Sequence, residues 1–161
     1  MLVEVVTGGG NLLLNVSPRG DGSLDPEHEA RLLEVGQWMH RYGEFIYGTR
    51  GGPIKNKKEF GGFTHKGNAL YFFMKSNAEG SVRIPLLQGR IIDIVCHTGE
   101  QLRTVEIDGI VHLSVEGIRD DLVTIVEIQF DQPVSHCFEH FDYESFDAFD
   151  NMKTRFDDTA L

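Results

Sequence analysis

The residues best suited to chemistry lie near the end of the sequence, where two histidines flank a cysteine. His136, Cys137 and His140 place two imidazoles four residues apart beside a thiol, and a helix would bring these zinc-type ligands to one face. The zincin motif, however, has a glutamate directly after its first histidine, and Cys137 occupies that place. We therefore interpret these side chains as incidental and predict no metal site and no cofactor.

Carboxylates and nucleophiles give no catalytic set either. Four carboxylates gather around one loop and helix start: Asp21, Asp25, Glu27 and Glu29. Turn and cap formation explains them, whereas glycoside hydrolysis needs two carboxylates facing each other across roughly 5–9.5 Å. The sequence has no Gly-x-Ser-x-Gly elbow, and neither Cys96 nor Cys137 has a convincing base beside it. We predict no catalytic residue in this chain.

Two further motifs have simpler structural explanations. A phosphate loop needs a strand before its glycines and a helix after them, but Gly8 to Gly10 follow a helical pattern and precede a strand pattern. Asn15-Val16-Ser17 matches a glycosylation sequon, yet Pro18 follows it and the asparagine falls in an apolar run. We expect neither a phosphate site nor an attached glycan.

Length and charge exclude several classes of protein. The chain has 161 residues and a net charge of −10, which is the wrong sign for binding nucleic acid or an anionic membrane. Two cysteines are too few for a disulfide scaffold. No apolar run approaches the length of a membrane helix, and no signal peptide is visible.

The elements that would position any site begin with a short helical unit. Leu2 to Val6 indicate the end of a helix, and the apolar run from Asn11 to Val16 is typical of a strand buried on both faces. Asp25 as N-cap and Pro26 at the first helical position predict an amphipathic helix over residues 26–42. One strand and one helix cannot bury their own sheet, so residues 1–50 look like a piece of something larger.

The middle of the chain alternates in short segments separated by turns. Lys66-Gly67-Asn68 and Asp108-Gly109 are hairpin signals, and seven or eight strands predict an antiparallel β-sandwich over residues 51–134. Tyr71, Phe72 and Phe73 point to alternating faces, which favours core packing over a sugar platform. The remainder, residues 135–161, carries seven acidic and two basic side chains among aromatic residues, and is expected to be either disordered or a marginal amphipathic helix.

One stretch resembles a known family. The run from Leu2 to Pro18, Asp21-Gly22, the segment from Pro26 to Trp38, and Gly43-Glu-Phe-Ile-Tyr-Gly-Thr-Arg50 closely resemble the α-L-fucosidases of glycoside hydrolase family 29. In that family this stretch forms the last βα unit of a (β/α)₈ catalytic barrel, and a C-terminal β-sandwich follows. The resemblance covers residues 1 to about 132 and implies a mainly β fold with one terminal barrel unit in front.

The resemblance also implies what is missing. The family performs a retaining hydrolysis with a nucleophilic aspartate and an acid/base glutamate, and both belong to earlier strands that have no counterpart in this sequence. Because active sites of such barrels lie at the C-terminal ends of the strands, Asn15 and Ser17 are candidates for the rim of a sugar pocket. Ser17 departs from the glycine usual in the family.

The sequence therefore predicts a C-terminal portion of an α-L-fucosidase-like hydrolase that is not catalytic alone. A fucosylated glycan is the partner implied for the complete enzyme, which in this family is usually secreted, periplasmic or lysosomal. The alternatives are a non-catalytic β-sandwich that binds carbohydrate or protein, and a docking role for the tail. The unpaired strand and helix are expected to pack on the sandwich or to associate with another copy of the chain.

Overall fold

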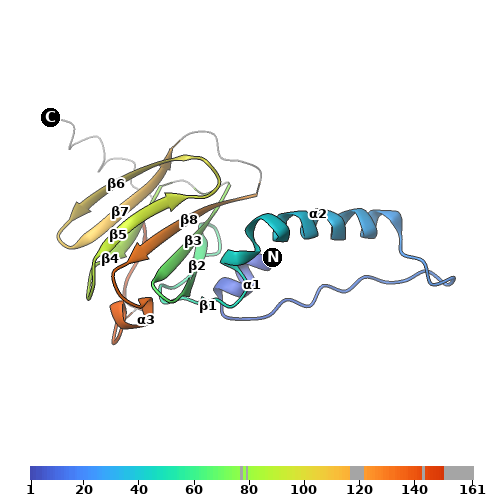
Figure 1. The fold of residues 1–161 in the computed structure, drawn as a ribbon, viewed down its shortest axis with the longest axis horizontal. Coiled ribbons are helices and arrows are strands. Elements are labelled where there is room, and N and C mark those ends of the chain that lie inside the picture. The colour runs from blue at the N-terminus through green and yellow to red at the C-terminus, as the bar shows by residue number, and fades with distance from the viewer. Residues whose placement is uncertain (77, 79, 117–121, 143, 151–161) are drawn as a thin grey trace.

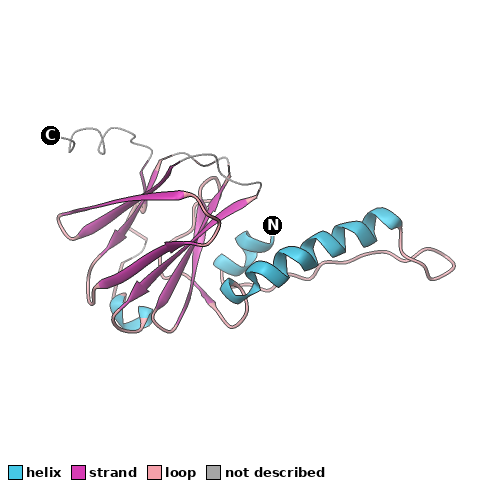
Figure 2. Ribbon diagram, turned by 45° about the horizontal axis from the view of Figure 1, so that its top comes forward, coloured by secondary structure: helices cyan, strands magenta, loops and turns pink. Residues whose placement is uncertain are grey.

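The computed structural model describes residues 1–76, 78, 80–116, 122–142 and 144–150. It shows a β-sandwich from which a helical unit projects (Figures 1 and 2). The helices are α1 (Leu2–Thr7), α2 (Pro26–Tyr42), the 3₁₀ helix η1 (Gly43–Phe45) and α3 (Val134–Cys137). The strands are β1 (Arg50–Gly51), β2 (Gly61–Lys66), β3 (Ala69–Lys75), β4 (Ser81–Pro85), β5 (Ile91–Cys96), β6 (Gln101–Ile107), β7 (Ile110–Glu116), β8 (Val123–Phe130) and β9 (Phe149–Asp150).

Two antiparallel sheets form the sandwich, as the sequence predicted. One has the strand order β1-β2-β3-β8-β5 and the other β6-β7-β4-β9. Both expected hairpins are present, with Lys66 paired to Ala69 and Ile107 paired to Ile110. Asp108 and Gly109 both adopt positive φ angles, which is the geometry of the two-residue turn that matches strand twist.

The five-stranded sheet is covered on both faces. Phe72 packs in the main core between the sheets. Its neighbours Tyr71 and Phe73 belong to a second apolar cluster, together with Phe45 and Trp38 of the helical unit. The strand alternation predicted for these three aromatic residues is therefore confirmed, and the helical unit is the layer that covers the outer face of this sheet.

Helix α2 forms over residues 26–42, as predicted. The Asp25 carboxylate accepts a hydrogen bond from the backbone N–H of Glu27 at 3.1 Å, and Pro26 occupies the first position. Gly43 follows with a right-handed φ of −62° and continues the chain into η1. The helix therefore ends in a tighter turn that delivers Phe45 to the sheet.

The strand predicted from Asn11 to Val16 is wrong. These residues run beside α2 without regular secondary structure, and the side chain of Leu13 is 81% exposed. A strand requires a neighbour for its backbone hydrogen bonds, and no described segment pairs with this one. The apolar side chains of this run are covered only in part by the rest of the described chain.

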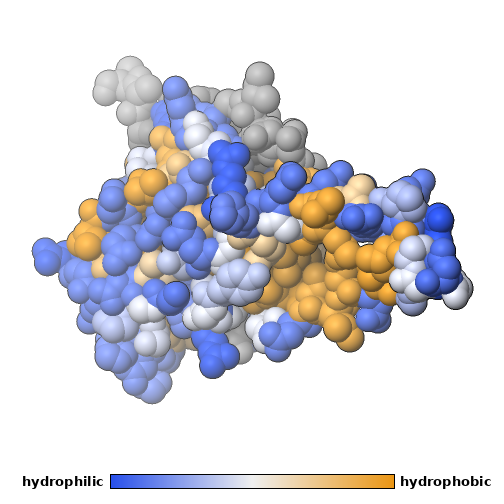
Figure 3. All heavy atoms as spheres, turned by 45° about the vertical axis from the view of Figure 1, so that its right-hand side comes forward, coloured by the Kyte–Doolittle hydropathy of each residue, from blue (hydrophilic) through white to orange (hydrophobic). Residues whose placement is uncertain are grey.

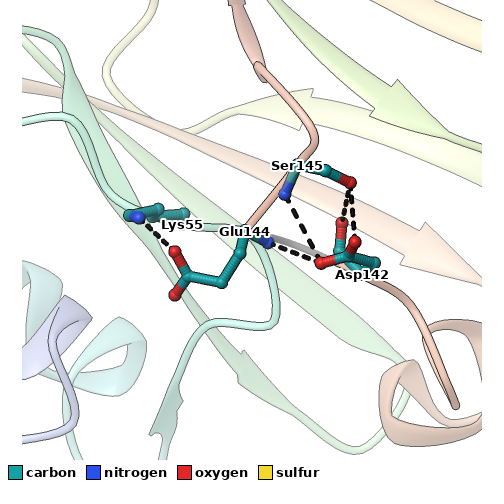
Figure 4. A network of polar contacts seen from close by, with 4 residues as sticks. All are labelled: Lys55, Asp142, Glu144 and Ser145. Atoms are coloured by element: carbon teal, nitrogen blue, oxygen red, sulfur yellow. Dashed lines mark hydrogen bonds and ion pairs between the residues drawn. The ribbon is translucent and has the colours of Figure 1, made fainter.

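The expected tail also differs from its structure where the structure describes it. Residues 134–142 and 144–150 fold onto the sandwich, with β9 pairing to β4 and the side chains of Phe138 and Phe149 in the main core. Asp142 and Ser145 hold a turn in this segment, and Glu144, within the turn, forms an ion pair with Lys55 (Figure 4). Burial of these aromatic side chains holds the segment on the sandwich despite its many acidic residues. Residues 151–161 lie outside the described residues.

Close packing at Gly51 fixes α1 to the sandwich. A Cβ atom there would lie 2.5 Å from both the amide nitrogen of Gly9 and the carbonyl oxygen of Thr7. We expect Gly51→Ala to lower the free energy of unfolding by about 1–3 kcal/mol, since backbone must move to admit the methyl group.

Gly36→Ala is the matched control for this substitution. Position 36 lies within α2 and has open space around it, so alanine should raise the free energy of unfolding by about 0.5–1 kcal/mol. Urea denaturation of both variants checks the prediction. Equal effects at the two positions would contradict the close approach at Gly51.

Candidate functional site

A hollow lies where the helical unit meets the sandwich. Its volume is about 460 Å³, and its walls come from α1, residues 12–14, α2, the end of β3 and the start of β8. Figure 3 shows an extensive apolar surface on this side of the molecule. The apolar lining of the hollow consists of Met1, Leu2, Val3, Leu12, Leu14, Val35, Trp38, Leu122 and Val123.

The charged side chains of this apolar hollow neutralise one another. Lys75 Nζ lies 2.6 Å from a carboxylate oxygen of Glu4, and Arg31 pairs with Glu34 at the same distance. The hydrogen bond and charge of Lys75 hold the pKa of Glu4 below its usual value. Because these charges are paired, the hollow is suited to contact with an apolar surface rather than to binding a charged ligand.

A second hollow adjoins the first on the other side of Trp38. It has a volume of about 390 Å³ and is lined by Trp38, Tyr42, Arg41, Gln37, Glu34, Thr98, Leu122 and Val123. The rings of Trp38 and Tyr42 are 5.5 Å apart, and the Arg41 guanidinium lies 5.0 Å from the Tyr42 ring centre. Aromatic faces next to amide, hydroxyl and charged groups are able to bind a polar ring.

The two residues predicted for a pocket rim lie on the extended segment. Asn15 and Ser17 are both exposed, and neither lines the hollows described above. The structure brings no second reactive group to them within the described residues. Their role in a sugar pocket stays a prediction.

The fold does not bring the side chains of His136, Cys137 and His140 together as a ligand set. Helix α3 ends at Cys137, and His140 follows in a left-handed turn with its side chain 89% exposed. The Cys137 thiol is buried, and burial together with the charge of Asp131 raises its pKa. Among the described residues there is no group of three or more His, Cys, Asp or Glu side chains placed to hold a metal ion.

A polar cluster that sequence reasoning missed joins β5, the connection between β5 and β6, and β8. The Glu100 carboxylate accepts hydrogen bonds from Cys96 at 3.1 Å, from Thr124 at 3.0 Å and from Thr98. Partial burial raises the pKa of Glu100, but these hydrogen bonds outweigh it and hold the pKa below its usual value. The cluster fixes the β5–β6 connection, and no pattern in the sequence could reveal a contact between Glu100 and Thr124.

The Glu100 cluster makes stability depend on pH. Since the folded-state pKa of Glu100 is depressed, its ionised form stabilises the fold above about pH 4.3, the usual value for glutamate, and this contribution is lost as the pH falls through the folded-state pKa. We expect Glu100→Gln to flatten the acid limb of stability against pH, measured by urea denaturation. Glu106→Gln, at an exposed position of β6, should keep the original slope; equal slopes for the two variants would contradict the role of the cluster.

The part of the chain that lines most of the apolar hollow is also the part that matches a known family. The family model described as alpha-L-fucosidase matches residues 1–44, the part that forms most of its walls. The tissue α-L-fucosidase of Bos taurus is 43% identical over 70 residues, and the human tissue enzyme is 40% identical over 72. The chain is thus similar to α-L-fucosidases. It matches the C-terminal part of these relatives, covering only 15% of the bovine and 16% of the human enzyme.

Solved α-L-fucosidases share the fold over most of the chain. The Thermotoga maritima α-fucosidase is 32% identical with a TM-score of 0.61, and the match covers 79% of this chain and 32% of that one. Isoenzyme 1 from Paenibacillus thiaminolyticus is 27% identical with a TM-score of 0.67, covering 81% and 33%. The chain therefore spans about a third of the fucosidases that it matches in structure. Within the described residues, no helix has the length and apolar character required to cross a membrane.

Proposed function

We propose that this chain is the C-terminal part of an α-L-fucosidase-like glycoside hydrolase and does not hydrolyse α-L-fucosides alone. In this proposal residues 1–50 are the terminal βα unit of the barrel and residues 51–134 are its β-sandwich. The observation that carries it is the apolar hollow with the extended segment beside it, which lie mostly in the part that matches the family. This is the surface that a closing unit would present to the remaining barrel.

The proposed role is structural support of a sugar pocket. With barrel strands beside it, the segment from Asn11 to Val16 would complete the ring, and α2 would cover its outside. Asn15 and Ser17 would then lie near the end of the barrel that carries the active site. The nucleophilic aspartate and the acid/base glutamate of the retaining reaction would come from the preceding part of the enzyme.

An aryl α-L-fucoside tests the proposal directly. The purified chain should release no aryl alcohol under conditions in which the Thermotoga maritima α-fucosidase turns over. Turnover that co-purifies with the chain through successive columns would overturn the proposed inactivity. A chimera in which this chain replaces the matching part of that enzyme should fold and retain fucosidase activity, whereas failure to fold would argue against the proposed role.

A glycan-binding module is the second candidate, and the hollow between Trp38, Tyr42 and Arg41 favours it. Trp38 is the only tryptophan in the sequence, so its fluorescence reports directly on this hollow. Binding would produce a saturable change in this fluorescence during titration with fucose or fucosylated oligosaccharides. The absence of binding on a glycan array would remove this candidate.

A further inference from the structure

The hollow lined by Trp38, Tyr42 and Arg41 lies between α2 and the sandwich, and we call it the aromatic hollow. Its volume of about 390 Å³ falls within the range of roughly 300–1,000 Å³ that is usual for small-molecule sites. One wall is α2, and the other comes from Thr98, in the β5–β6 connection, and from the start of β8. The Thr98 hydroxyl donates a hydrogen bond to the Glu100 carboxylate, so the Glu100 cluster holds this wall in place.

The side of α2 that faces the aromatic hollow is polar. The helical period of 3.6 residues places Glu34, Gln37 and Arg41 together on this side. The same period places Leu32 and Met39 on the opposite side of the helix, which is the apolar side available to the barrel in the function proposed above. The aromatic hollow therefore lies away from the face of α2 that the barrel would cover, and none of its walls comes from the residues before α2.

The charges around the aromatic hollow leave one cation facing it. Glu34 pairs with Arg31 at 2.6 Å, whereas Arg41 forms no ion pair with a carboxylate of the described residues. The Arg41 guanidinium lies over the Tyr42 ring, 5.0 Å from its centre. The ring attracts this cation but does not occupy the N–H donors at its edge, and those donors have the geometry to bind an anion at two points.

A sugar ring that carries an anionic substituent matches this set of groups. The rings of Trp38 and Tyr42, 5.5 Å apart, offer an apolar surface for the C–H face of a pyranose. The Gln37 amide has donors and acceptors for its hydroxyl groups. Because the chain carries a net charge of −10, its overall field disfavours an anion, so the attraction has to come from Arg41 itself.

We propose that the aromatic hollow binds an acidic sugar, whose carboxylate or sulfate pairs with the Arg41 guanidinium while the sugar ring packs on Trp38 and Tyr42. This inference rests on the second function proposed above, glycan binding, and specifies the class of glycan. It requires a selection for negative charge that a site for neutral fucose does not need.

Sugars that differ only in charge test this selection. Methyl α-D-galacturonide has a carboxylate where methyl α-D-galactoside has a hydroxymethyl group, and galactose 6-sulfate is the sulfate probe. Titration of the 161-residue chain, followed by Trp38 fluorescence, should give a dissociation constant about tenfold lower for an acidic probe than for the neutral galactoside, since hydrogen bonds to an ionised group are the stronger ones. Comparison of the two acidic probes identifies which anion the site accepts.

Arg41→Gln removes the cation and keeps a polar side chain at this exposed position. It should raise the dissociation constant for the acidic probe about tenfold and leave that for the galactoside unchanged. Arg90→Gln is the matched control, because it removes the same charge from an exposed arginine at the opposite end of β5 from Thr98. It should change neither constant, and circular dichroism should show the same fold for both variants.

The outcomes separate this inference from the function on which it rests. Equal binding of acidic and neutral sugars would overturn the inference and leave glycan binding in place. Binding of none of the sugars would remove both. A preference for the acidic probes that Arg41→Gln and Arg90→Gln reduce equally would also overturn the inference, because the overall charge of the chain would then account for it.

Discussion

Replacing Phe149 by alanine should lower the free energy of unfolding by about 3–5 kcal/mol, the usual cost of removing a buried aromatic ring. The side chain is 4% exposed and lies in the main core. Its ring centre is 4.9 Å from that of Phe60 and 6.1 Å from that of Phe63. The loss should appear as a lower urea midpoint and as weaker pairing of β9 with β4.

Tyr47→Ala provides the comparison for Phe149→Ala, since this aromatic ring is 65% exposed. Its effect should stay within about 0.5 kcal/mol, as for most exposed positions. If Phe149→Ala matched Tyr47→Ala, the segment after residue 134 would not be part of the sandwich. A much larger loss of stability for Phe149→Ala than for Tyr47→Ala would instead show that the sandwich extends past residue 134, the limit predicted from the sequence.

Local signals predicted the elements whose residues determine their own geometry. Asp25 and Pro26 specify the start of α2, and Asp108-Gly109 specifies a tight turn wherever the flanking strands pair. The alternation of Tyr71, Phe72 and Phe73 is likewise set by the two-residue period of a strand. These features need only neighbours in sequence, and each is found in the structure.

Features that depend on distant partners could not be predicted in the same way. The run from Asn11 to Val16 has the composition of a buried strand, but a strand forms only beside another. Phe149 sits among acidic residues, and only the open edge of β4 makes its short strand possible. The hollow has the same origin, because its walls combine residues from the start, the middle and the later part of the chain.

Phe45→Ala should release the helical unit from the sandwich. The ring is 3% exposed and packs against Tyr71 and His97, with ring centres 5.2 and 4.6 Å away. We expect a loss of about 3–5 kcal/mol, concentrated in the second apolar cluster rather than the main core. Trp38 belongs to that cluster, so its emission should shift to longer wavelength, and proteases should cleave the connection around residues 46–52 faster.

Phe45→Leu separates the loss of anchoring from a general loss of stability. Leucine keeps much of the apolar volume, so the shift in Trp38 emission and the gain in cleavage should both be smaller than with alanine. The hydrogen bond from the Thr64 hydroxyl to the carbonyl oxygen of residue 45, 3.1 Å long, uses only backbone at that position, so neither substitution removes its acceptor. If alanine left emission and cleavage unchanged, the hold on the helical unit would lie instead in the contact of α1 with Gly51. Gly51→Ala would then be the variant that detaches the unit.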